Sequence, residues 1–254
     1  MVTPVLAEKL RAGETVYTGW CALPEPLVAE LVARAGFACV TLEMQHGLQD
    51  IGSVMRGIGA IALAGKPAAV RIPVGDNATA SRVLDMGAEA VIAPMINSVA
   101  DARSFVAAMK YPPIGERSWG PSRVLSLRDT QPQGHLETSN RVSLAFAMIE
   151  TRTALDALDD ILDVDGLDGV FVGPSDLSVT LSDGKKIAPL DRDLDEPIKR
   201  IADRATAHGK IAGIYAVNPE RANLFRSFGY RFIALGSDQI FVTNGAKAML
   251  AALK

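Results

Sequence analysis

The sequence contains few of the features that mark specialised classes of protein. Two cysteines, Cys21 and Cys39, are too few for a disulfide framework in a chain of 254 residues. The net charge is only −3, from 26 Lys and Arg against 29 Asp and Glu, which argues against nucleic acid or an anionic membrane as the main partner. Aromatic residues make up 6%, but hydrophobic residues make up 48%, which excludes a disordered chain.

Two further absences concern location. The nearly apolar stretch 58–74 is broken by Lys66, Pro67 and Arg71, so no membrane-spanning helix is expected. Residues 1–14 show no basic segment followed by an apolar one, so no secretory signal is expected. We therefore expect a cytoplasmic protein that acts on a small molecule, with neither nucleic acid nor a membrane as partner.

Apolar strand-like runs alternate with amphipathic helical segments along the whole chain. The runs cover residues 16–23, 37–43, 68–73, 90–95, 142–150, 167–173, 210–217 and 230–236, and the helical segments cover 24–35, 50–64, 77–86, 99–110, 151–163, 196–208, 218–228 and 239–253. Such alternation predicts a parallel sheet, and eight units close an α/β barrel of about 250 residues. We predict a single (β/α)8 TIM-barrel domain over residues 1–254. The alternative is an open doubly wound sheet, but Pro24-Glu25-Pro26 follows the first strand instead of its usual glycine-rich turn.

Residues 111–141 interrupt this alternation. The segment is rich in proline and glycine and contains Arg117, Trp119 and Arg123. A long irregular segment in a compact domain is usually functional, so we interpret it as a lid or substrate loop at the active end of strand 4. Residues 183–195 are a smaller candidate of the same kind.

Polar residues follow the predicted strands where the carboxyl ends of a barrel meet at one mouth. They are Trp20, Glu43, His46, Arg71, Glu150, the run Gly173-Pro174-Ser175-Asp176, and Gly236-Ser237-Asp238. Four acids, one histidine and one arginine exceed what packing alone requires. We therefore predict a catalytic site at this mouth.

Two of these acids predict a metal site. Glu150 and Asp176 end adjacent strands, and two carboxylates so close repel each other unless a cation neutralises them. Hard oxygen ligands suit Mg²⁺ or Mn²⁺, and such an ion polarises a carbonyl as a Lewis acid. We expect a divalent ion, Mg²⁺, Mn²⁺ or Co²⁺, with Glu150 and Asp176 as ligands.

The remaining mouth residues fit the chemistry of an enolate. Arg71 can stabilise an enolate oxygen, and histidine is the side chain that ordinarily titrates near neutral pH, so His46 is the expected proton shuttle. Backbone N–H groups after Gly173-Pro174 can hold a carboxylate at a helix start. No lysine follows a predicted strand, since Lys66 and Lys210 precede strands, so Schiff-base catalysis is disfavoured.

The chain resembles a known family in the order of its motifs and in the residues that make them up. These are Gly36-Phe37, Glu43-Met44-Gln45-His46-Gly47, Arg71-Ile72-Pro73, Leu84-Asp85-Met86-Gly87, Pro94-Met95, Tyr111-Pro112-Pro113, Gly115-Glu116-Arg117, Ile149-Glu150-Thr151 and the run from Gly169 to Ser178. They resemble the HpcH/HpaI aldolase family of class II, metal-dependent pyruvate aldolases, typified by 4-hydroxy-2-oxoheptanedioate and 2-dehydro-3-deoxyglucarate aldolases. The resemblance implies a barrel of the phosphoenolpyruvate/pyruvate-domain type.

The resemblance also implies roles for individual residues. Pyruvate would chelate a metal ion on Glu150 and Asp176, Arg71 would contact the oxygen that becomes the enolate, and Trp20 would line the pocket. The amides of Ser175 and Asp176 would hold the carboxylate. His46, with Asp85 as its acidic partner, would deprotonate a metal-bound water.

Assembly and specificity follow from the same resemblance. Our topology places Asp85 away from the mouth, so it can assist only from a neighbouring subunit. The family is typically a hexamer, a trimer of dimers, in which the C-terminal helix (here about 239–253) is exchanged. Independently of the resemblance, Arg117 and Arg123 on the predicted loop are candidates for binding CoA phosphates or an acidic acceptor.

The motif around the histidine departs from the common family pattern, Asp-x-Glu-His. Glu43 stands where the family has the aspartate, and it is a candidate catalytic residue. Gln45 stands where the family has the glutamate, as in a subgroup of the family. The sequence therefore predicts an aldolase that cleaves a 4-hydroxy-2-oxo acid to pyruvate and an aldehyde. The alternatives are an acyl-CoA lyase or oxaloacetate decarboxylase that uses the same enolate, and a non-catalytic oxo-acid-binding protein.

Overall fold

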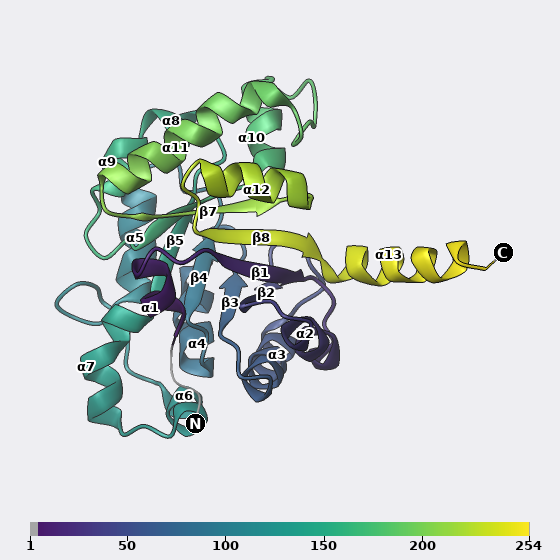
Figure 1. Cartoon of the computed structure of the whole chain (residues 1–254). Helices are drawn as coiled ribbons and strands as arrows, with labels where there is room; N and C mark the ends of the chain where they lie inside the picture. Colours follow the sequence, from purple (N-terminus) through teal and green to yellow (C-terminus); the bar gives the residue numbers. More distant parts are fainter. Residues whose placement is uncertain (1–4, 254) are drawn as a thin grey trace.

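The computed structural model describes residues 5–253, and its strands form a closed barrel in which each strand pairs in parallel with its neighbours in chain order (Figure 1). Residues 1–4 and 254, at the ends of the predicted domain, lie outside the described residues. The strands are β1 (Val16–Cys21), β2 (Cys39–Glu43), β3 (Ala68–Arg71), β4 (Ala90–Ala93), β5 (Leu144–Met148), β6 (Gly169–Val172), β7 (Ile211–Ala216) and β8 (Phe232–Ser237). The predicted TIM barrel is confirmed.

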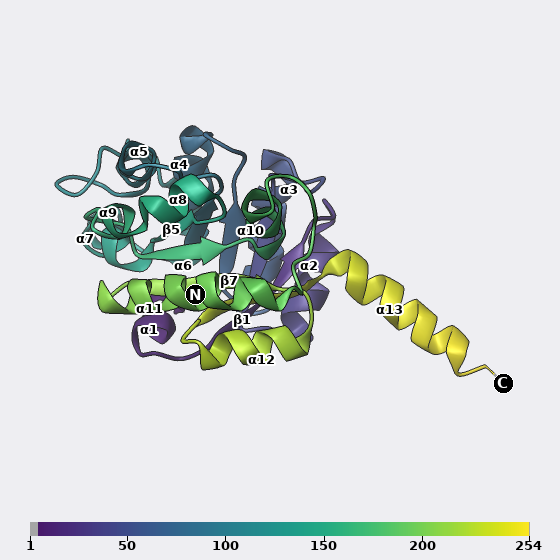
Figure 2. The ribbon, with the colours of Figure 1, turned by 90° about the horizontal axis from the view of Figure 1, so that it is seen from above.

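Helices surround the barrel, and a C-terminal helix extends away from it (Figures 1 and 2). Their bounds are α1 (Leu6–Arg11), α2 (Pro26–Arg34), α3 (Ile51–Leu63), α4 (Asn77–Met86), α5 (Val99–Met109), α6 (Ser122–Arg128), α7 (Pro132–Val142), α8 (Arg152–Asp156), α9 (Leu158–Leu162), α10 (Pro174–Leu181), the 3₁₀ helix η1 (Arg192–Leu194), α11 (Asp195–Ala207), α12 (Pro219–Ser227) and α13 (Asp238–Ala251). The helix predicted over 151–163 is divided into α8 and α9. None of the helices in residues 5–253 is long and apolar enough to cross a membrane.

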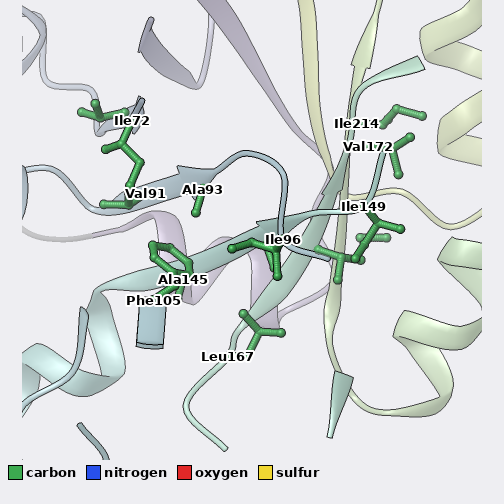
Figure 3. Close-up of a cluster of buried hydrophobic side chains, with 14 of the residues drawn as sticks. Ile72, Val91, Ala93, Ile96, Phe105, Ala145, Ile149, Leu167, Val172 and Ile214 are labelled. Atoms are coloured by element: carbon green, nitrogen blue, oxygen red, sulfur yellow. The ribbon is translucent and has the colours of Figure 1, made fainter. Parts of the chain in front are cut away.

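The strands read as continuous apolar runs because both of their faces are buried. Along β5, Phe146 and Met148 belong to the cluster that fills the barrel, whereas Ala145 and Ala147 belong to the cluster between barrel and helices. Figure 3 shows part of the outer cluster, with Ile149 near the end of the same strand. The period of two therefore decides which side chains of a strand reach the interior and the mouth.

Residues 111–141 lie at the opposite end of the barrel from the mouth. The residue before them, Lys110, donates from Nζ to the Ser143 carbonyl at 2.5 Å and to Asp168 Oδ2 at 2.6 Å, and these acceptors immediately precede β5 and β6. Most of the segment folds into α6 and α7. The predicted position of a lid on the active face is therefore wrong, because α5 returns the chain to the amino ends of the strands before the segment begins.

A buried polar cluster fills the space beneath this segment. Arg117, whose side chain is fully buried, donates to Asp85 Oδ1 at 2.5 Å and lies over the ring of Tyr111 at 4.6 Å. His135 is 3% exposed, and its Nε2 has no hydrogen-bond partner in the described residues. Burial, with the nearby charges of Arg128 and Arg117, lowers the pKa of His135 to about 4.

Protonation of His135 is expected to destabilise the protein in mild acid. Its folded-state pKa lies below the ordinary value of about 6.5, so the unfolded chain takes up the proton first as the pH falls. This contribution is complete above pH ~6.5 and is lost towards pH 4, which amounts to about 2 kcal/mol of unfolding free energy between pH 7 and pH 5. Urea unfolding at both pH values should show a smaller difference for His135→Phe. A His135→Phe difference as large as that of the wild type would contradict the assignment.

Candidate active site

A cavity of about 290 Å³ opens at the carboxyl ends of the strands. It brings together most of the mouth residues that the sequence indicated: Trp20, Glu43, His46, Arg71, Gly173, Pro174, Ser175, Asp176 and Ser237. The other lining residues are Ala22, Gly47, Met148, Phe171, Tyr215 and Gln239. Glu150 lines an adjoining cavity on the other side of Asp176, so the two predicted metal ligands lie where the cavities meet.

Glu43 organises one wall of the cavity. Its Oε2 accepts hydrogen bonds from Trp20 Nε1 at 2.8 Å and from Arg71 Nε at 2.6 Å, with Arg71 Nη2 at 2.5 Å. Its Oε1 accepts from the backbone N–H groups of Gln45 at 2.6 Å and His46 at 3.1 Å. A carboxylate has about four lone-pair sites, so these donors occupy it fully. Glu43 therefore holds the arginine, the indole and the histidine loop in place, and is not free to act as a base.

Arg71 is fixed with one side of its guanidinium free. β2 and β3 pair Glu43 with Arg71 in register, which places their side chains next to each other at the strand ends. The guanidinium carbon also lies 5.1 Å from the centre of the Trp20 ring. Nη1 points towards Met148, 4.0 Å from its sulfur, and has no acidic partner among residues 5–253. This nitrogen is the donor available to an anionic oxygen in the cavity.

Glu150 and Asp176 border the same small space. A Cβ atom at Gly173 would lie 2.7 Å from Glu150 Oε2 and 3.6 Å from Asp176 Oδ2, so only glycine leaves this space open. Glu150 Oε1 accepts from the Met95 N–H at 2.8 Å, which turns the other oxygen towards Asp176. Burial, with the nearby charge of Asp176, raises the pKa of Glu150 to about 7, and that environment favours either a proton or a cation.

The donor set fits a hard divalent ion with open coordination positions. In residues 5–253 no group of three or more His, Cys, Asp or Glu side chains converges, so a closed structural metal site is not present there. Two carboxylates that face one gap match Mg²⁺ or Mn²⁺ sites, which keep room for water and substrate. The observation that supports this fit is the space at Gly173, which both carboxylates border.

The start of α10 presents free backbone donors beside Asp176. The helix begins directly after β6, with Pro174 in its first turn, and no side chain caps it at Gly173. The N–H groups at a helix start have no partner within the helix and attract anions. Ser175 and Asp176 lie at this start and are exposed to the cavity, so their amides are placed to hold a carboxylate.

His46 lies on the loop after β2, and only its backbone is fixed by hydrogen bonds. Gly47 lets this loop turn tightly, since a Cβ there would lie 2.3 Å from the Glu43 carbonyl oxygen. The imidazole is exposed at the cavity and makes no hydrogen bond to the described residues. Asp85, its predicted partner, is paired with Arg117 at the far end of α4.

Arg123 is also distant from the mouth of its own barrel. It lies on α6 and lines a separate shallow depression with Arg56, Gly59 and Leu63 of α3. The expectation that Arg123 binds substrate rested on placing residues 111–141 at the active face, and the structure does not place them there. Within one chain, therefore, neither Asp85 nor Arg123 reaches the cavity.

Several residues that shape the site were missed in the sequence. Met148 and Tyr215 point into the mouth from the ends of β5 and β7, and Gln239 enters from the start of α13. Met95 holds Glu150 from the β4–α5 loop and adopts a left-handed backbone, with φ of 56°. The alternation of side chains along each strand could have indicated them, because inward-facing residues near the carboxyl end of a strand also face the mouth.

Comparison with known proteins agrees with this geometry. The family model described as HpcH/HpaI aldolase/citrate lyase matches residues 17–245. The chain belongs to this family. It is 36% identical to a hydroxypyruvate/pyruvate aldolase of Rhizorhabdus wittichii, over 94% of each chain, and 32% identical to a 2-keto-3-deoxy-L-rhamnonate aldolase of Escherichia coli, over 100% of this chain and 94% of that protein.

Solved structures share this fold. An HpcH/HpaI aldolase from Desulfitobacterium hafniense superposes with a TM-score of 0.89 at 26% identity, covering 98% of this chain and 96% of that one. The citrate lyase beta subunit of M. tuberculosis, solved with oxaloacetate and magnesium, shares the fold with a TM-score of 0.58 at 18% identity over 91% of this chain and 95% of that one. This HpcH/HpaI protein is therefore an enzyme of an aldolase family, some of whose fold relatives bind magnesium.

Proposed function

We propose that this HpcH/HpaI enzyme cleaves a 4-hydroxy-2-oxo acid reversibly into pyruvate and an aldehyde. The observation that carries the proposal is the convergence of Glu150 and Asp176 on the open space at Gly173, beside an arginine that Glu43 holds in place. A divalent ion held by these two carboxylates would, together with the arginine, stabilise the negative charge of an enolate, which is the common intermediate of pyruvate aldol chemistry.

A divalent ion held by Glu150 and Asp176 would supply a Lewis acid for the oxygens of the keto acid. Backbone and side-chain groups of the chain itself perform the remaining tasks. The amides at Ser175 and Asp176 bind the carboxylate, and Arg71 Nη1 faces the oxygen that gains negative charge. His46 moves a proton between the C4 hydroxyl and solvent. As that hydroxyl loses its proton the C3–C4 bond breaks, the aldehyde leaves, and C3 is protonated to give the pyruvate methyl group.

The proposal is tested by release of pyruvate from a panel of 4-hydroxy-2-oxo acids. Protein stripped of metal is expected to be inactive and to recover on addition of Mg²⁺, Mn²⁺ or Co²⁺. Saturable binding of pyruvate without turnover would instead indicate an oxo-acid-binding protein. Turnover restricted to an acyl-CoA or oxaloacetate would favour the lyase or decarboxylase, although Arg71 is the only Lys or Arg among the residues that line the cavity, which leaves few partners for CoA phosphates.

We further propose that the enzyme works as a homo-oligomer. His46 has no acidic partner in its own described chain, whereas Asp85 lies at the far end of the barrel. Helix α13 projects from the barrel and exposes Val242, Met249 and Leu250 (Figure 2). A second copy that covers α13 and supplies Asp85 to His46 would account for both features. Light scattering gives the mass in solution, and full turnover by a monomer would contradict this assembly.

A further inference from the structure

Tyr215 is a mouth residue to which the mechanism above gives no role. It is the inward-facing residue nearest the end of β7, since its neighbours Ile214 and Ala216 pack in the outer cluster. Its ring meets the Trp20 ring edge to face, with centres 5.6 Å apart and planes at 88°. Because Glu43 fixes the indole, the contact also fixes the position of Tyr215 in the cavity.

The hydroxyl of Tyr215 is available to a ligand. It makes no hydrogen bond with any of residues 5–253, and it is not among the buried polar atoms that lack a partner, so it faces the open cavity. Burial of the ring raises the pKa of Tyr215, so the group keeps its proton at neutral pH and can donate as well as accept. A phenol held in this way is a neutral recognition group.

The charges around the cavity oppose a second carboxylate on the substrate. Within one chain, Arg71 is the only Lys or Arg among the described residues that line the cavity, and Glu43 balances it. A divalent ion would balance the charges of Glu150 and Asp176. With the carboxylate of the keto acid bound, the net charge of the site would then be negative. An acceptor that carries its own carboxylate would therefore meet repulsion, whereas a hydroxyl group would meet Tyr215.

We propose that Tyr215 determines acceptor specificity by hydrogen bonding to a hydroxyl of a small, uncharged hydroxyaldehyde. This inference rests on the proposed aldolase function and names its acceptor class. A site that contains a hydrogen-bonding group discriminates against an analogue without the matching hydroxyl, because its own polar group is then left unpaired. The preferred acceptors are accordingly hydroxyaldehydes, ahead of simple alkyl aldehydes and of semialdehydes with a carboxylate.

Glycolaldehyde and propionaldehyde are a matched pair for the test, because each has four non-hydrogen atoms and only the first has a hydroxyl. The wild-type enzyme, saturated with pyruvate and Mn²⁺, is expected to favour glycolaldehyde in kcat/KM. Tyr215→Phe keeps the ring and its contact with Trp20 and removes only the oxygen. It should lower kcat/KM for glycolaldehyde by about 5- to 10-fold, the loss expected for one hydrogen bond, and leave propionaldehyde nearly unchanged.

Two controls separate this inference from the function on which it rests. Exchange of the pyruvate methyl protons with deuterated water reports enolate formation alone and should be the same in Tyr215→Phe and wild type. Tyr17→Phe changes a tyrosine that packs outside the barrel and should leave the acceptor ratio unchanged. An equal loss for both aldehydes in Tyr215→Phe, an unchanged ratio, or a wild-type preference for succinic semialdehyde would overturn the proposal. Absence of exchange in wild type would refute the aldolase assignment itself.

Discussion

Arg71→Ala is expected to slow exchange of the pyruvate methyl protons by about 10²- to 10³-fold, the usual loss when one donor to a developing oxyanion is removed. The reason is geometric. Two nitrogens of Arg71 are bound to Glu43, and only Nη1 is free to face the cavity. The charge therefore stays in place as the enolate forms. The exchange rate, measured by proton NMR in deuterated water with Mn²⁺ removed after quenching, checks this step without the aldehyde.

The fold of Arg71→Ala is expected to persist. Glu43 loses one partner but still accepts from Trp20 and from two backbone N–H groups, so the cost in unfolding free energy is about 1–3 kcal/mol. Arg71→Lys keeps the charge without the planar fork, so it should recover only part of the exchange rate. Arg226→Ala, on the exposed face of α12, is the matched control for loss of an arginine. Exchange at the wild-type rate in a folded Arg71→Ala protein would refute the role.

The barrel was predictable because its signals are local. Apolar runs and helical periodicity mark each strand and helix, and the polar residues directly after the strands reach the mouth in any barrel. This logic brought Glu43, Arg71 and Asp176 together from positions far apart in the chain. The roles within the site were harder to predict. The hydrogen bonds that occupy the Glu43 carboxylate depend on its pairing with Arg71 on the neighbouring strand. No single segment of the sequence contains that pairing.

The incorrect predictions have a common physical cause: residues were assigned to the wrong end of the barrel. A βα unit returns the chain to the amino ends of the strands, so residues 111–141, which follow α5, lie away from the mouth. Arg123 was misplaced with them. Tyr215 was not predicted because it lies within β7 and not after it. It reaches the mouth because its side chain is on the inward face of that strand.

Glu150→Gln is expected to abolish tight binding of the divalent ion while preserving the fold. The amide keeps the size of the side chain, and its oxygen can still accept from the Met95 N–H, but one of the two carboxylates that face Gly173 is lost. Loss of a group that merely orients a metal ligand already costs about 10- to 100-fold in affinity, so removal of a ligand should cost at least ~100-fold.

Calorimetric titration with Mn²⁺ measures this loss, and the shift in melting temperature gives an independent readout, since an ion that binds only the folded chain stabilises it by mass action. Wild type should melt at a higher temperature with Mn²⁺, and Glu150→Gln should not. Asp183→Asn is the matched control, because this carboxylate lines the adjoining cavity but its side chain is 72% exposed and paired with Arg152. Equal losses in both variants would mean that the general negative charge of this region attracts the ion, whereas a loss confined to Glu150→Gln locates the ion at the space that glycine leaves open.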